Sequence, residues 1–77
     1  MKISVLSYPE AGVPRPHAFQ LGGRRVAVVA ILEQWQATGH RYYQVRDLDG
    51  RRFVLRYCPE SATWELEGVY GRARAVA

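Results

Sequence analysis

Two runs in the middle of the chain, residues 41–47 and 51–57, alternate between apolar and polar side chains. This is the period of a β-strand with one buried face. A connecting loop of three residues brings the apolar members of both runs onto one face. A two-residue loop would divide them, because a slip of one residue turns every side chain over. The register predicted for this antiparallel hairpin pairs Val45 with Phe53, Tyr43 with Leu55, and Arg41 with Tyr57. Asp47 and Gly50 are typical of a type I turn closed by a left-handed glycine.

The N-terminal third predicts a strand, a loop and a second hairpin. Residues 2–7 alternate and predict a first strand at a sheet edge. Residues 8–16 hold three prolines and a glycine, which favours a surface loop or an extended arm along a sheet edge. Gly22 and Gly23 favour a two-residue turn with positive φ angles. That turn pairs Phe19 with Val26 and His17 with Val28.

Residues 26–35 carry two competing patterns. The continuous apolar stretch 26–32 is typical of a strand buried on both faces. A helical stripe is also present, formed by Val28, Ile31, Leu32 and Trp35. The many β-branched residues favour the strand. We therefore expect a strand to about Ala30 and a bent strand beyond it, with a short helical turn ending near Thr38 as the alternative.

A last strand is expected over residues 63–70, after a loop led by Pro59. Continuing the hairpin register onto this strand pairs Tyr57 with Trp64, Leu55 with Leu66, Phe53 with Gly68, Arg56 with Glu65 and Val54 with Glu67. The tail at 71–77 is small and basic, and we expect it to be flexible.

These elements predict one mainly β domain covering all 77 residues. The expected architecture is a small antiparallel meander of five to six strands that curls into an SH3-like or open barrel. A single cysteine excludes an intramolecular disulfide and favours a reducing, cytoplasmic location. No run approaches the roughly 20 apolar residues that span a bilayer, so no membrane segment is expected.

Candidate catalytic and metal-binding residues are few. His17, His40 and Cys58 stand far apart, without the spacing of zinc ligands or of a nucleophile and its base. We expect Cys58 to be a buried structural thiol. The sequence therefore predicts no metal, no cofactor and no enzymatic activity.

The basic residues point to a different kind of site. The formal net charge is +4, and Lys2 is the only lysine. The predicted register places Arg46 directly opposite Arg52, and like charges so placed are unfavourable. Either neighbouring carboxylates (Asp47, Asp49 or Glu67) screen the two guanidinium groups, or the groups converge on an external anion such as a phosphate.

Other side chains extend this candidate site. Tyr42, on the same face, offers a flat ring of the kind that stacks on nucleobases. Arg24 and Arg25 stand at the tip of the glycine hairpin, where they can reach a polyanion. Trp35 is a candidate anchor for a protein partner if the strand bends and exposes it. A genome rich in G and C would produce the arginine bias without any function.

Several motifs resemble a small bacterial domain family. They are Phe19, Gly23-Arg24-Arg25-Val26, Ile31-Leu32-Glu33-Gln34-Trp35, Tyr42-Tyr43-Gln44-Val45-Arg46, the Gly50 turn, Leu55 and Trp64-Glu65-Leu66. The family occurs as stand-alone proteins and as a C-terminal extension of inactive Y-family DNA polymerase homologues. The resemblance implies a β domain that works as an accessory module near DNA-repair machinery, without catalytic residues to carry over.

Two functional classes follow from the sequence. The first is a non-enzymatic module that contacts nucleic acid, or a nucleic-acid enzyme, through Arg24, Arg25, Tyr42, Arg46 and Arg52. The second is a protein-interaction or homodimerisation module that uses a sheet edge or a patch around Trp35. The salt dependence of binding distinguishes the two classes, because affinity for phosphate groups falls steeply as the salt concentration rises.

Overall fold

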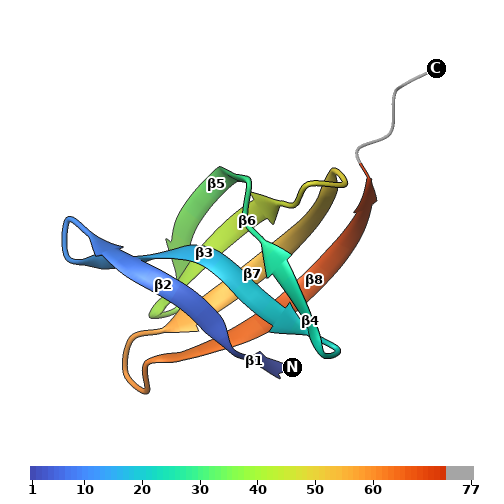
Figure 1. The fold of residues 1–77 in the computed structure, drawn as a ribbon. Helices are drawn as coiled ribbons and strands as arrows, with labels where there is room; N and C mark the ends of the chain where they lie inside the picture. The colour runs from blue at the N-terminus through green and yellow to red at the C-terminus, as the bar shows by residue number, and fades with distance from the viewer. Residues whose placement is uncertain (73–77) are drawn as a thin grey trace.

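Two antiparallel sheets packed face to face make up the computed structural model of the chain, which describes residues 1–72 (Figure 1). The larger sheet has the strand order β1-β8-β7-β6-β5, and the smaller one has the order β2-β3-β4. Their bounds are β1 Lys2–Ile3, β2 Val5–Glu10, β3 Val13–Leu21, β4 Arg24–Ala27, β5 Ala30–Ala37, β6 His40–Arg46, β7 Arg51–Cys58 and β8 Thr63–Arg72. The mainly β, antiparallel prediction is confirmed, although the sheets do not close into a barrel.

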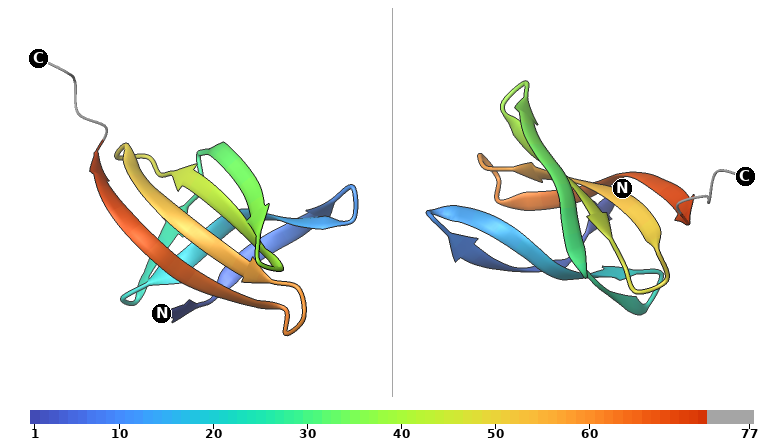
Figure 2. Two further views of the ribbon diagram at one scale, coloured as in Figure 1. Left: turned by 180° about the vertical axis from the view of Figure 1, so that it is seen from behind. Right: turned by 90° about the horizontal axis from the view of Figure 1, so that it is seen from above.

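The core lies between the two sheets, which Figure 2 shows as two layers in the view from above. Its buried members come mostly from alternate positions of β6 and β7: Tyr43, Val45, Phe53 and Leu55, joined by Phe19 and Trp64. Phe19 of the smaller sheet meets Phe53 of the larger one edge to face, with ring centroids 5.1 Å apart. This aromatic contact joins the two layers at the centre.

The register predicted for the β6–β7 hairpin is confirmed, pair by pair, from Arg41–Tyr57 to Arg46–Arg52. The turn has the expected form, because the Gly50 N–H donates to the Asp47 carbonyl over 3.2 Å and Gly50 has a φ of 81°. The glycine hairpin is confirmed too, with Phe19 opposite Val26.

The chain passes between the sheets at two places, and this explains why there are eight strands rather than five or six. The expected strand 2–7 divides at Ser4, so that β1 joins β8 and β2 joins β3. The second passage is at Val28 and Val29. The Val28 N–H donates to His17 of the smaller sheet, and the Val29 N–H donates to Arg46 of the larger one. No helical turn follows, and the expected strand continues as β5.

Two expectations about this region are wrong. Residues 26–32 are not buried on both faces, because Val29 and Leu32 are each 46% exposed. The loop expected over residues 8–16 is wrong, whereas the alternative of an extended arm along a sheet edge is right in part. β2 is an edge strand of the smaller sheet, and it forms a hairpin with β3 through a turn at Ala11 and Gly12.

Prolines fit this hairpin because of where their nitrogens point. Pro9 lies directly opposite Pro14, and two residues without an N–H cannot form a hydrogen-bonded pair. Each nitrogen therefore faces away from the partner strand. Pro16 has the same parity as Pro14 and lies opposite Ser7, so its nitrogen faces the same way. No ladder hydrogen bond between β2 and β3 is lost.

The predicted register onto β8 is right at one end and wrong at the other. Tyr57 lies opposite Trp64 and Leu55 opposite Leu66, as expected. A bulge then shifts the pairing, so that Val54 faces Gly68 and Phe53 faces Val69. The extra residue is Glu67, which the alternation rule placed opposite Val54. Of the expected tail at 71–77, Gly71 and Arg72 belong to β8, and residues 73–77 lie outside the described part.

Candidate nucleic-acid interface

The outer face of the larger sheet is the side turned away from the smaller sheet, and it carries a row of polar and aromatic side chains. The row runs from β5 to β1 through Trp35, Tyr42, Arg56, Glu65 and Lys2, which are neighbours in the ladder. Trp35 stacks on Tyr42 with their rings within 3° of parallel and the centroids 5.3 Å apart. Trp35 is 38% exposed. Tyr42 is less exposed than Trp35.

Arg56 holds the middle of this row. Its guanidinium donates to Glu65 over 2.6 Å, and its Nε lies 3.6 Å from Glu67. Burial opposes its positive charge, but contacts with Tyr42 and Glu65 outweigh this effect and raise the pKa of Arg56. Both carboxylates of β8 are thereby engaged with Arg56, which is a structural arrangement.

Arg46 and Arg52 form a second row two pairs further along the same face. Among the side chains that the structure describes, no carboxylate lies within 4.0 Å of either guanidinium group. The Nε of Arg52 is buried and has no hydrogen-bond partner there. Both side chains are half-buried, so the two charges are held close to the sheet without a counter-charge in contact.

Two of the three carboxylates expected to screen this pair, Asp47 and Glu67, are directed elsewhere, and Asp49 lies within 4.0 Å of neither guanidinium group. Asp47 is only 7% exposed, and its Oδ1 accepts the backbone N–H groups of Asp49 and Arg51 at 3.0 and 2.8 Å. Glu67 approaches Arg56 instead. Asp47 therefore stabilises the turn that sets the hairpin register, and the Arg46–Arg52 pair has no ion pair in the described part of the chain.

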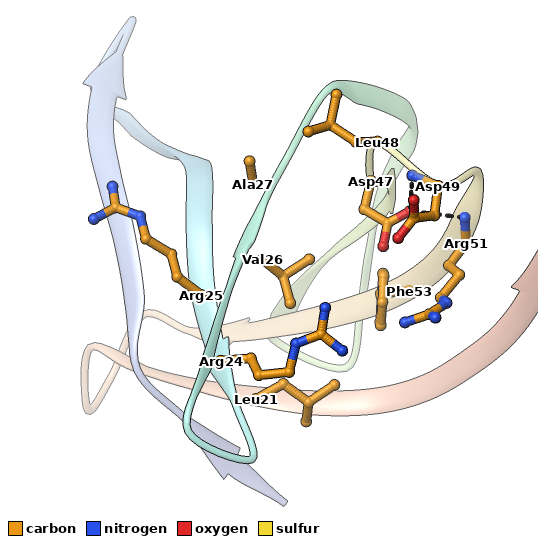
Figure 3. A pocket seen from close by; sticks show the side chains of 10 residues that line it. All are labelled: Leu21, Arg24, Arg25, Val26, Ala27, Asp47, Leu48, Asp49, Arg51 and Phe53. Carbon is orange, nitrogen blue, oxygen red and sulfur yellow. Dashed lines mark hydrogen bonds between the residues drawn. The ribbon is translucent and has the colours of Figure 1, made fainter.

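The structure divides the candidate residues into two groups. Tyr42, Arg46 and Arg52 share the outer face of the larger sheet. Arg24 and Arg25 lie on β4 of the smaller sheet and point in opposite directions, since neighbouring strand residues alternate. Arg24 shares the inward face with Val26, whereas Arg25 points outward (Figure 3).

Arg24 faces a hollow that sequence reasoning missed. Its volume is about 160 Å³, and it opens between the β3–β4 hairpin and the β6–β7 turn. Figure 3 shows the guanidinium groups of Arg24 and Arg51 turned toward its centre, among the apolar side chains Leu21, Val26 and Phe53. The sequence did carry a signal for Arg51, because Arg51 has the same parity as the buried Phe53 and is the first residue of β7.

The remaining candidates are separated from these groups. Cys58 is half-exposed rather than buried. His17 meets the edge of Tyr8, and the Nδ1 of His40 lies 3.0 Å from the Thr38 carbonyl. No three of the histidines, cysteine or acidic residues gather as metal ligands within the described residues. The same residues contain no helix that could cross a membrane.

Comparison with known proteins gives no match: no family model, curated protein or solved structure corresponds to this chain. The site therefore has to be interpreted from its own geometry.

Proposed function

We propose that the chain is a non-enzymatic module that binds nucleic acid through the outer face of its larger sheet. One observation carries the proposal. Arg46 and Arg52 are opposed in the ladder with no carboxylate in contact among the described side chains. Two like charges held together cost stability. A phosphate between them removes that cost and accepts parallel hydrogen bonds from each planar guanidinium.

Single-stranded nucleic acid suits this face better than a duplex. Trp35, stacked on Tyr42, offers a flat ring on the same face as the two arginines. Splayed bases stack on such rings, and basic residues follow the backbone. The described residues form strands only and offer no helix that could enter a major groove. Arg46 and Arg52 are therefore assigned to phosphate, and Trp35 with Tyr42 to base stacking.

Finer features belong to the same proposal. A small SH3-like β domain of this kind, in a bacterial cytoplasm, suits an accessory role beside a nucleic-acid enzyme. The motifs that resemble the polymerase-associated family support this context. The single cysteine, Cys58, is compatible with a reducing compartment.

An NMR titration tests the proposal. Short single-stranded and duplex DNA are added to the labelled protein at about 50 mM and about 200 mM salt. Shifts should cluster on β6 and β7, with the single strand bound more tightly. Two phosphate contacts predict a loss of affinity of about fivefold to tenfold between these salt concentrations.

Variants separate this site from general positive charge. Arg46→Ala/Arg52→Ala should abolish binding and raise the unfolding free energy by about 0.2–1 kcal/mol, because the repulsion disappears. Arg15→Ala/Arg41→Ala is the matched control, since these residues line a different hollow beside Tyr43. Equal weakening by both double variants, or unchanged binding by the first, would contradict the proposal.

Homodimerisation is the second candidate, and the edge of the larger sheet favours it. β5 pairs only with β6 among the described strands, and its residues from Leu32 onward are exposed. It contains no lysine or proline to protect this edge, and its one charged residue, Glu33, and its register shift lie toward the start of the strand. Sedimentation velocity at rising concentration tests this alternative. Gln34→Lys on this edge should restore a monomer, whereas a chain that stays monomeric at every concentration rules the dimer out.

A further inference from the structure

The hollow between the β3–β4 hairpin and the β6–β7 turn brings arginines from both sheets together with apolar side chains. Arg24 and Arg51 are both exposed, and each lies on the inward-facing side of its strand. Neither has a carboxylate within 4.0 Å among the described side chains. They come from different sheets, so only the packing of the two layers brings them to the same opening (Figure 3).

The lining of the hollow holds three arginines and two aspartates, which gives a formal charge of +1. Asp47 and Asp49 both line the hollow. The Oδ1 atom of Asp47 is already occupied by two backbone N–H groups, which offset part of its charge. Arg25 also contributes to the lining, but its side chain turns away from the opening (Figure 3). The free donors that remain toward the centre are therefore the two guanidinium groups.

We infer that this hollow is a binding site for a phosphate monoester. A terminal phosphate carries a charge of about −1.5 to −2 at pH 7 and offers three acceptor oxygens. Two guanidinium groups that line one hollow match that dianion better than the single charge of an internal phosphodiester. A volume of about 160 Å³ is roughly five times the share of one water molecule in the liquid, which leaves room for the phosphate and the start of its ester.

The hollow is separate from the proposed nucleic-acid surface. Arg51 and Arg52 are neighbours on β7, so their side chains leave opposite faces of the sheet. The phosphate monoester can come from a free nucleotide or from the 5′ end of a strand. Both present the same terminal phosphate, and the experiment distinguishes them.

Titration of the labelled protein with inorganic phosphate, a mononucleotide and a short DNA strand with or without a 5′-phosphate tests the site at low salt. We expect saturable shifts at the side-chain N–H groups of Arg24 and Arg51. A preference for the phosphorylated strand over the mononucleotide identifies a strand end as the source, and the reverse preference identifies a free nucleotide.

Three single variants complete the test. They are comparable because each removes one positive charge from an exposed position. Arg24→Gln and Arg51→Gln should each weaken binding of inorganic phosphate about tenfold or more, as expected for loss of a charge-assisted hydrogen bond. Arg25→Gln, one residue away on the opposite face, should change it less than twofold. Equal weakening by all three, or no saturable shift, overturns the inference. The Arg46→Ala/Arg52→Ala variant should leave phosphate binding intact, so failure of either site is recognised separately.

Discussion

At the scale of single residues, most polar groups near the turns have a structural explanation. Asp47 accepts hydrogen bonds that close the β6–β7 turn, and Arg56 is held by Glu65 and Glu67. Arg46 and Arg52 differ because no acidic partner contacts them in the described part of the chain. A residue left without such a partner is the better indicator of an external ligand.

Cys58 gives a prediction about pH. Its interaction with the Ser61 side chain, helped by the backbone of Ser61 and Glu60, lowers the pKa of the Cys58 thiol. The thiolate is the reactive form, so the folded chain should react with a thiol reagent at half its limiting rate below the usual pH of about 8.5. Because the folded pKa is the lower one, this contribution to stability is present above about pH 8.5 and is lost as pH falls through the folded value.

Ser61→Ala should move the pH of half-maximal reaction upward, toward that of the unfolded chain. Stopped-flow alkylation across a pH series measures the shift. Ser7→Ala, remote on β2, is the control and should leave the profile unchanged. A profile that does not move in Ser61→Ala would show that the Ser61 hydroxyl has no part in the effect.

At the scale of elements, the strands that obey strict alternation were predictable. The β6–β7 hairpin was fixed by its apolar face and by the turn residues Asp47 and Gly50. The bulge on β8 was not predicted, although the spacing of apolar residues in the sequence indicates it. Leu66 and Val69 are separated by three positions, which breaks the period of two.

The proline-rich hairpin could not be predicted from composition. Whether a proline interrupts a strand depends on which way its nitrogen points, and this is set by the partner strand. The division of the candidate arginines has a similar cause. Sequence places Arg24 and Arg51 on separate strands, and only the packing of one sheet on the other brings them to one hollow.

Tyr43 links two elements and gives a prediction about the β2–β3 hairpin. Burial raises the pKa of Tyr43, so its hydroxyl stays protonated and donates to the Pro14 carbonyl on β3. Tyr43→Phe should lower the unfolding free energy by about 0.5–1.5 kcal/mol. Amide hydrogen exchange should also become faster in residues 10–15. Tyr57→Phe, whose ring packs on Trp64, is the control; equal acceleration in both variants would contradict the link.

At the scale of the whole molecule, the two sheets depend on each other. A chain of 77 residues buries only about 60–65% of the surface that its unfolded form exposes. The smaller sheet contributes few fully buried side chains, with Phe19 the largest of them in the core. Unfolding should therefore be a single cooperative transition that both sheets share.

Phe19→Ala tests this dependence. Loss of a buried phenylalanine costs about 3–5 kcal/mol, which is a large part of the stability of so small a domain. The fluorescence of the tryptophans on the larger sheet and the amide exchange of β3 should report the same destabilisation. Leu6→Ala, at an exposed position of β2, is the control. If the amides of β6 and β7 in Phe19→Ala stay protected from hydrogen exchange while those of β2–β4 lose their protection, the two sheets are independent units.

The prolines of the β2–β3 hairpin also affect how copies of this protein meet. Pro9 removes an amide donor from the outer edge of β2, and Pro14 and Pro16 remove two from the side of β3 beyond the end of β4. A strand of another molecule that docks there lacks N–H donors at the proline positions, so it forms fewer backbone hydrogen bonds. Ordered fibre growth from this hairpin is therefore suppressed. β5 contains no proline, and its register shift is confined to the segment between Ile31 and Glu33. Any fibrillar aggregate that this protein forms should therefore begin at β5, and one proline placed in that strand should delay it.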